Sequence, residues 1–376
     1  MSPVTFTHNH YRAERLFPFH LTTAVEAIPS GMLTNRKRWE LVVEQELQSG
    51  NGEKWVIPAN LLPSEDLISL LKTLKAGEFL HLNDREGIAV IGFENDHEGF
   101  SGRPVAVLPQ EALKWLEFGW NIFEQNSYLL QFDFNLLTKG RRSVPIPEGN
   151  RFTGGNAIFI EEGASVRFAF INAEEGPVYI SREALIMEGA CIRGPVFIGK
   201  KAVVKMGTRI YGGTTVGDHC TVGGEIKNTV FFPFSNKAHD GYVGDSVIGH
   251  WCNLGGGTSN SNLKNTAGNI SVVLPSGVYK AGMKCGVLMG DYTRTAINTS
   301  INSGTVIGIG ANVFGSGLTP KLIPSFSWGY DDTVLYEAEK ILEHLERWMG
   351  TKQQTITIKE KEQINHIYYQ TKTKKS

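Results

Sequence analysis

Residues 178–227 read VYISREALIMEGACIRGPVFIGKKAVVKMGTRIYGGTTVGDHCTVGGEIK, and this stretch repeats every six residues. Each sixth residue from Ile180 to Val222 is isoleucine or valine. The residues four places after these are small or β-branched: Ala184, Ala190, Val196, Ala202, Thr208, Thr214, Cys220 and Ile226. A period of six does not match the 3.6-residue period of a helix and is too regular for isolated strands. The pattern predicts a parallel β-helix of hexapeptide repeats, with three short strands in each coil of about 18 residues.

The same register returns near the end of the repeat region, at Met289, Thr295, Ile301, Ile307 and Val313. We therefore expect the β-helix to occupy residues 154–320. A mixed α/β domain is expected before it at residues 1–145, and a helical segment after it at residues 326–376. Within that last segment, residues 332–349 have helical apolar spacing.

Charge and cysteine content limit the class of protein. The chain has 37 Lys and Arg against 38 Asp and Glu, so we expect binding neither to nucleic acid nor to a membrane surface. The cysteines lie about thirty residues apart, unlike a metal knuckle or a dense disulfide framework. Neither a signal peptide nor an apolar run of about 18 residues is visible. A soluble, cytoplasmic protein is expected, with Cys220 and Cys252 inward-facing and with Cys191 and Cys285 as the candidates for exposed thiols.

The six-residue step fails after Lys227, and we expect an extruded loop there. Arg209 and Lys227 are 18 residues apart in the sequence. A regular coil would stack them on one face, where two like charges favour a bridging phosphate. The alternative is a pair of solvated side chains that splay apart.

The segment after the break carries polar side chains suited to a ligand. His239 is a candidate base, because histidine is the usual general base in enzymes, and Asp240 and Tyr242 lie beside it in the sequence. Amides and a glycine run follow at Asn253, 255–257, Asn260 and Asn262. Together they predict a site for a polar phosphorylated molecule. A structural histidine and glycines that only form tight corners are the alternative.

Two runs resemble a known enzyme family. KAHDGYVGDSVIG (237–249) and NLGGGT (253–258) resemble the acetyltransferase domain of the bifunctional glucosamine-1-phosphate acetyltransferase and N-acetylglucosamine-1-phosphate uridylyltransferase. SNLKN (261–265) and MGDYTRTAINTSI (289–301) are similar to the archaeal-type sugar-phosphate nucleotidylyltransferase with an attached β-helix.

The resemblance implies left-handed coils and a role for each matched residue. Arg209 and Lys227 would bind the sugar 1-phosphate, and His239 would be the general base. Tyr242, Asn253 and Asn262 would contact the phosphate and the sugar, while Leu263 replaces a family tyrosine.

The resemblance also implies the acetyl donor and the assembly. The donor would be acetyl-CoA, bound in a groove between the chains of a homotrimer. Four cations are candidates for the coenzyme phosphates: Lys264, Lys280, Lys284 and Arg294.

The N-terminal segment is similar to a short alternative form of this enzyme with a sugar nucleotidyltransferase domain. The matching stretches are LFPFHLTTAVEAIPSGMLTNRKRWE (16–40), WNIFEQN (120–126) and LLTKGR (136–141). The glycine-rich loop ending in Gly-Thr-Arg is absent, and Thr23 and Pro29 replace arginines. We interpret residues 36–38 as a solvated basic helix start. The domain is therefore expected to be degenerate, with Mg²⁺ required only if it is active and no other metal site.

Three functions are consistent with these observations. The first is an N-acetyltransferase acting on glucosamine 1-phosphate or a close amino-sugar 1-phosphate, in UDP-N-acetylglucosamine-type nucleotide-sugar synthesis. The second is a uridylyl or thymidylyl transferase acting on a sugar 1-phosphate. The third is a trimeric scaffold without catalysis.

Overall fold

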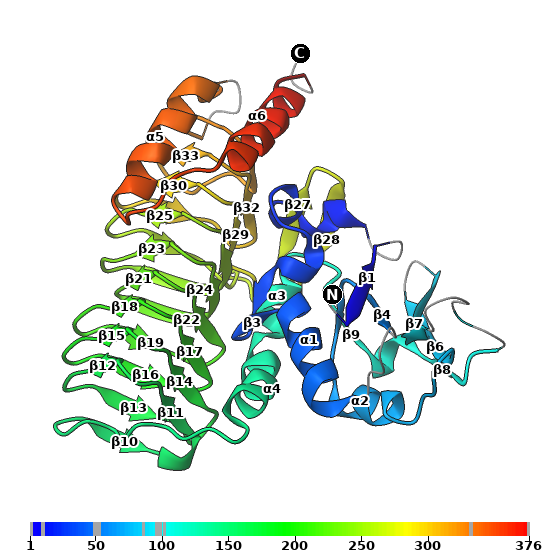
Figure 1. The fold of residues 1–376 in the computed structure, drawn as a ribbon. Helices are drawn as coiled ribbons and strands as arrows, with labels where there is room; N and C mark the ends of the chain where they lie inside the picture. Colours follow the sequence, from blue (N-terminus) through cyan, green and yellow to red (C-terminus); the bar gives the residue numbers. More distant parts are fainter. Residues whose placement is uncertain are drawn as a thin grey trace.

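The computed structural model describes residues 3–8, 12–47, 54–84, 87–94, 100, 103–330 and 334–373. A β-solenoid forms one side of the molecule, and an α/β domain lies against its flank (Figure 1). Two C-terminal helices cover one end of the solenoid.

The solenoid has three faces, which we call A, B and C. Face A contains β10 (Arg151–Thr153), β13 (Phe170–Asn172), β16 (Cys191–Arg193), β19 (Arg209–Ile210), the first halves of β22 (Glu225–Phe231) and β24 (Tyr242–Ile248), β26 (Ser259–Asn260) and β31 (Ser300–Ile301). Face B contains β11 (Ile158–Ile160), β14 (Val178–Ile180), β17 (Val196–Ile198), β20 (Thr214–Val216), the second halves of β22 and β24, β29 (Val287–Met289), β32 (Thr305–Ile307) and β34 (Leu322–Ile323). Face C contains β12 (Ser165–Val166), β15 (Leu185–Ile186), β18 (Val203–Val204), β21 (Thr221–Val222), β23 (Asn236–Lys237), β25 (Asn253–Leu254), β30 (Arg294–Thr295) and β33 (Asn312–Val313).

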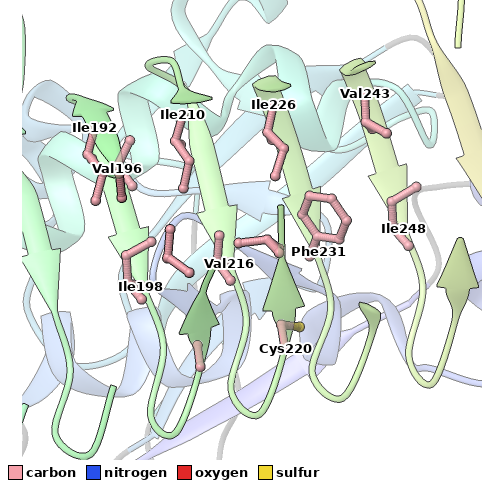
Figure 2. Close-up of a cluster of buried hydrophobic side chains, with 14 of the residues drawn as sticks. Ile192, Val196, Ile198, Ile210, Val216, Cys220, Ile226, Phe231, Val243 and Ile248 are labelled. Atoms are coloured by element: carbon pink, nitrogen blue, oxygen red, sulfur yellow. The ribbon is translucent and has the colours of Figure 1, made fainter. Parts of the chain in front are cut away.

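The predicted repeat sets the register of the coils. Ile180 pairs with Ile198 and Ile198 with Val216, steps of 18 residues in parallel strands. The six-residue column points inward, where its side chains fill the interior (Figure 2). The parallel β-solenoid is therefore confirmed, and its left-handed winding remains an expectation from the resemblance.

The prediction of an extruded loop directly after Lys227 is wrong. Ile210 pairs with Ile226, and Ile226 with Val243, so the chain continues in coils that are shorter than 18 residues. Shortening a corner leaves the inward side chains in place, and a search at a fixed step of six misses it. The chain leaves the solenoid only over residues 261–286, which carry the hairpin of β27 (Ser271–Leu274) and β28 (Gly277–Lys280).

The N-terminal domain is built on a mixed sheet. Its strands are ordered β1 (Val4–Thr7), β4 (Lys54–Pro58), β7 (Gly87–Glu94), β6 (Phe79–Asp84) and β8 (Ala106–Leu108). Two short strand pairs accompany it: β2 (Pro29–Ser30) with β3 (Leu33–Thr34), and β5 (Leu61–Leu62) with β9 (Lys114–Trp115). The helices are α1 (Asn35–Glu46), α2 (Glu65–Leu71), α3 (Asn121–Glu124) and α4 (Asn126–Thr138). Thr34 and Ser64 cap α1 and α2 by accepting backbone N–H bonds.

This domain shares a core with face B. The middle residue of each three-residue strand on that face points away from the interior, and most of these residues are apolar. Tyr179, Val230 and Leu288 are examples, and all three are buried against the domain or its helix α4. Phe19 and Ile28 of the domain lie in the same cluster as Val230 and Leu288. The domain and the solenoid therefore depend on each other to exclude water.

Polar contacts fix the register of this docking. Asn126 accepts a hydrogen bond from Gly31 N at 2.7 Å and donates to Gly213 O at 2.7 Å. Thr215 on face B donates to Gly31 O at 2.7 Å. All these groups are buried, so each bond also satisfies an atom that water cannot reach.

The basic helix start predicted at residues 36–38 is only partly solvated. Arg38 is fully buried, and its guanidinium forms two bonds to Asp133 of α4, at 2.7 and 2.9 Å. Arg36 pairs with Glu26 at 2.5 Å and lies over the Phe6 ring. The interpretation as a solvated start is wrong for Arg38, because α4 supplies a carboxylate that is distant in sequence.

The C-terminal segment forms α5 (Ala338–Gly350) and α6 (Ile358–Thr373). Residues 331–333, at the start of the predicted helix, lie outside the described residues. Ile341 and Leu345 of α5 share a core with Ile364 and Ile367 of α6. No helix in the described part of the chain is long and apolar enough to cross a membrane.

We predict that Asp133→Ala lowers the free energy of unfolding by about 3–5 kcal/mol, because it leaves the buried Arg38 charge without its partner. Urea denaturation measures the loss. Lys72→Met is the matched control, since it removes an ion pair with Glu46 at the surface and should cost less than about 1 kcal/mol. Equal effects from the two variants would contradict the importance of the buried pair.

Candidate active site

Tyr242 and Asn262 are brought together on face A. Tyr242 is the first residue of β24, and Asn262 follows β26 where the chain leaves the solenoid. The Asn262 Nδ2 donates to the Tyr242 Oη at 2.9 Å. This contact joins two of the residues assigned to the site from sequence.

Asp245 and Asn228 complete a network that the sequence analysis missed. Asp245 is 4% exposed and accepts from Asn262 Nδ2 at 2.5 Å and from Asn228 Nδ2 at 2.7 Å. Both Asn228 and Asp245 have positive φ, of 45° and 47°, where β22 and β24 pass from face A to face B. Asn and Asp tolerate this conformation better than most residues. Their one-coil pairing depends on the shortened coils, so the six-residue pattern could not have found it.

The network determines which hydrogen-bond donors and acceptors of the site remain free for a ligand. Both N–H bonds of the Asn262 amide are used, and the Tyr242 oxygen already accepts one of them. Burial raises the pKa of Tyr242 to about 12, so its hydroxyl keeps its proton at neutral pH. The pair therefore offers a ligand one donor, the Tyr242 O–H, and one acceptor, the Asn262 Oδ1.

The predicted stacking of Arg209 on Lys227 is wrong. Arg209 pairs in register with Glu225, because the intervening coil is short, and the Nε of Arg209 lies 3.5 Å from the Glu225 Oε2. Lys227 pairs in register with Gly244 and has an exposed side chain. The two cations are thus diagonal neighbours on face A, and a carboxylate stands in the column of Arg209.

Arg209 also lines an open groove on face A. The groove has a volume of about 500 Å³, and its other basic residues are Arg151 and Arg193. Phe170 and Tyr211 contribute aromatic surface to it. Two of these arginines are paired with carboxylates, Arg193 with Glu175 and Arg209 with Glu225.

His239 lies in the corner between β23 and β24, two residues after a face C strand and three before Tyr242. Its side chain is exposed. The glycine run lies one coil above it: a Cβ built on Gly256 would be 3.5 Å from the Cβ of His239. Gly257 N donates to Asp240 O at 2.9 Å. The glycines therefore pack against the candidate base.

Asn253 does not join this group within one chain. It lies on face C, in register with Asn236 below and Arg294 above. Tyr242 and Asn262 lie at face A. The assigned residues therefore divide between two faces, with His239 at the corner between them.

The candidate coenzyme cations also divide into two groups. Lys264, Lys280 and Lys284 all belong to the excursion at 261–286, where Leu263 and Lys284 form a bridge. Lys264 Nζ donates to Asn269 O at 2.5 Å. Arg294 lies on face C beneath Trp348 of α5, with its guanidinium carbon 5.1 Å from the ring centroid. Only the three lysines extend from the solenoid wall.

Thiol chemistry is not favoured in this site. Cys220, Cys252 and Cys285 are buried, and burial raises the pKa of Cys220 to about 12. The exposure suggested for Cys285 is wrong, because this residue packs in the core shared with the N-terminal domain. Cys191 is exposed in the face A groove. Among the described residues, no three His, Cys, Asp or Glu side chains gather as a metal site.

Known proteins match both parts of the chain. Residues 5–142 match the family model described as sugar nucleotidyl transferase. The bifunctional protein GlmU of Methanococcus vannielii is 30% identical over 289 residues, which cover 72% of this chain and 55% of that protein. The bifunctional sugar-1-phosphate nucleotidylyltransferase/acetyltransferase of Sulfurisphaera tokodaii is 30% identical over 205 residues, 53% of this chain and 45% of that protein.

The chain is a homologue of these bifunctional proteins. The resemblance noted in the sequence motifs is therefore confirmed. The chain spans about half the length of the curated relatives it matches, such as 55% and 47% of two GlmU proteins.

Solved structures show only a weak global similarity. A UDP-N-acetylglucosamine acyltransferase aligns with a TM-score of 0.24 at 12% identity, covering 50% of this chain and 71% of that one. The polysialic acid O-acetyltransferase OatWY aligns with a TM-score of 0.22 at 15% identity, covering 48% of this chain and 79% of that one. The placement of the site residues therefore rests on this chain's own geometry.

We predict that Asp245→Ala lowers the free energy of unfolding by about 1–3 kcal/mol, because two half-buried side-chain amides lose their shared, buried acceptor. Glu162→Ala is the control: this exposed carboxylate lies on a distant coil of the solenoid, and its removal should change stability by less than about 0.5 kcal/mol. Thermal unfolding of both variants measures the difference. Similar melting temperatures would show that Asp245 does not hold the network.

Proposed function

We propose that this protein is an N-acetyltransferase that moves the acetyl group of acetyl-CoA to the amine of an amino-sugar 1-phosphate. Glucosamine 1-phosphate is the first candidate, as a step toward a UDP-N-acetylglucosamine-type nucleotide sugar. The observation that carries this proposal is the exposed His239, which packs against the glycine run and precedes Tyr242 of the Tyr242–Asn262 pair by three residues. The Sulfurisphaera tokodaii relative, whose name includes acetyltransferase, supports the same reaction.

The phosphate of the acceptor would be bound at face A. Lys227 has no ion-pair partner among the described residues, and the Tyr242 hydroxyl is free to donate. Arg209 can join by leaving Glu225, since a half-exposed ion pair is worth only about 0–1 kcal/mol. A charge-assisted bond to phosphate is worth more, about 1.5–3 kcal/mol. The Asn262 Oδ1 then accepts from a hydroxyl or the amine of the sugar.

The reaction needs one proton transfer and no covalent enzyme intermediate. The amine nitrogen attacks the thioester carbonyl carbon while His239 accepts the proton that the nitrogen loses. Backbone N–H groups of the corner stabilise the negative charge on the carbonyl oxygen. The C–S bond then breaks, and the coenzyme A sulfur leaves and is protonated.

The donor and the assembly are proposed from the family resemblance, and the division of residues between faces supports them. Lys264, Lys280 and Lys284 on the excursion would bind the phosphates of acetyl-CoA, while Arg294 is covered by Trp348. Asn253 on face C can reach a Tyr242 site only in another copy of the chain. We therefore include a homotrimer in the proposal, with face C of one chain near face A of the next.

Nucleotidyl transfer is the second candidate function. The match of residues 5–142 to sugar nucleotidyl transferases favours it. Arg36 and Arg38, however, are used in ion pairs with Glu26 and Asp133. Pyrophosphate release from UTP or dTTP with a sugar 1-phosphate and Mg²⁺ tests this activity separately from acetyl transfer.

We predict that His239→Ala lowers the kcat of acetyl transfer about 100- to 10,000-fold with little change in either KM, because a general base acts in the transition state. A thiol-release assay with acetyl-CoA and glucosamine 1-phosphate measures it. His219→Ala changes a histidine in a corner of the neighbouring coil and should retain turnover. A His239 variant with normal kcat would refute this base.

We also predict that Lys227→Ala raises the KM for glucosamine 1-phosphate about 10- to 100-fold, from the loss of a charge-assisted bond. Arg209→Ala should have a smaller effect, because Glu225 already offsets its charge. The Glu225→Gln variant should lower this KM by releasing Arg209. If Arg209→Ala and Lys227→Ala raise this KM equally and Glu225→Gln leaves it unchanged, the two cations bind the phosphate as an equal pair, as the sequence predicted.

A further inference from the structure

Lys237 occupies a place where a solenoid normally has an aliphatic side chain. It pairs in register with Val222, which points into the interior. Lys237 is 0% exposed and is among the largest fully buried side chains in the described part of the chain. A buried ammonium loses its hydration, so it persists only where it gains strong partners.

Both partners of this ammonium belong to one corner. The Nζ of Lys237 donates to the carbonyl oxygen of His239 and, at 3.0 Å, to that of Asp240. Burial lowers the pKa of Lys237 to about 8, and the nearby Asp240 carboxylate opposes that shift. The group thus remains largely charged at neutral pH and can make charge-assisted bonds.

Neighbouring coils hold the same corner from below and above. Below, a Cβ on Gly224 would lie 3.0 Å from His239 O and 2.6 Å from Gly241 O. Above, Gly257 N donates to Asp240 O at 2.9 Å, and Gly256 faces the His239 side chain. The backbone of residues 239–241 is therefore fixed on three sides, and Lys237 is the contact from the interior.

A second lysine shows that the contact by itself is structural. Lys321 donates through its Nζ to the carbonyl oxygen of Ser303, another solenoid corner, and burial also lowers its pKa. That corner carries none of the assigned site residues. Lys321 is half-buried where Lys237 is fully buried, and it holds a different corner, so it is a control for the loss of a lysine–carbonyl bond outside the site.

We propose that Lys237 is a positioning residue of the acetyl-transfer site, whose buried ammonium holds the backbone of His239 and Asp240 and thereby directs the imidazole toward the acceptor amine. The inference rests on the proposed function. Its contacts are with backbone atoms only, so it binds neither substrate. Its loss should therefore affect the rate of the chemical step and not substrate binding.

The test compares Lys237→Met with Lys321→Met in the full-length protein. Methionine retains most of the side-chain length and removes the donors. We expect Lys237→Met to lower kcat about 10- to 100-fold with both KM values within about twofold of wild type, the scale that misplacement of a catalytic group produces. Lys321→Met should retain the wild-type kcat even if its melting temperature falls. A normal kcat in Lys237→Met, or equal losses in both variants, would overturn the proposal.

A second measurement does not depend on catalysis. Hydrogen exchange followed by mass spectrometry should show faster exchange in the peptide covering residues 238–241 in Lys237→Met, and no change there in Lys321→Met. If Lys237→Met does not fold, Lys237→Gln, which keeps one shorter donor, replaces it and should give an intermediate kcat. Wild-type protein without acetyl transfer would refute the proposed function, whereas unchanged exchange at residues 238–241 would refute the role of Lys237.

Discussion

Filling the interior of each coil is the constraint on which this structure depends. Three short strands per coil each turn an aliphatic side chain inward, and successive coils stack these side chains in register (Figure 2). The interior positions accept few substitutions, since close-packed cores tolerate few changes of side-chain volume. The outward positions are therefore where the three faces differ. Face B is apolar and covered, face A is open and carries both charged and aromatic side chains, and face C contacts α5 through Arg294.

One departure from this constraint lies next to the candidate base. Lys237 occupies an interior position that is aliphatic in most coils, and its ammonium contacts the corner that carries His239. Burying this charge has a cost in free energy that an aliphatic side chain avoids. Buried polar groups that break the local pattern commonly mark functional places in a fold. The position of Lys237 is therefore an argument for function that is independent of any relative.

The N-terminal domain is part of the solenoid's core as well as a domain with its own sheet. Phe19 and Ile28 pack with Val230 and Leu288, so removing the domain would expose a continuous apolar face. Asn126 bonds to Gly213, and a Cβ on Gly213 would lie 2.4 Å from the Asn228 side chain. Asn228 in turn donates to Asp245. The domain therefore supports the wall that carries the site, whatever its own activity with nucleotides.

The sequence by itself determined the solenoid, because a six-residue spacing of branched side chains is a local property that survives without knowledge of contacts. It also singled out His239, Tyr242 and Asn262 as candidate site residues, through motifs that resemble those of a known family. Only the tertiary structure decided which residues meet across coils. Arg209 faces Glu225 and not Lys227, Arg38 is paired with Asp133, and Asp245 orders Asn262, since each of these contacts depends on coil length or on docking between distant segments. The periodicity shows which side chains point inward, but the length of each corner determines which residues of adjacent coils are neighbours.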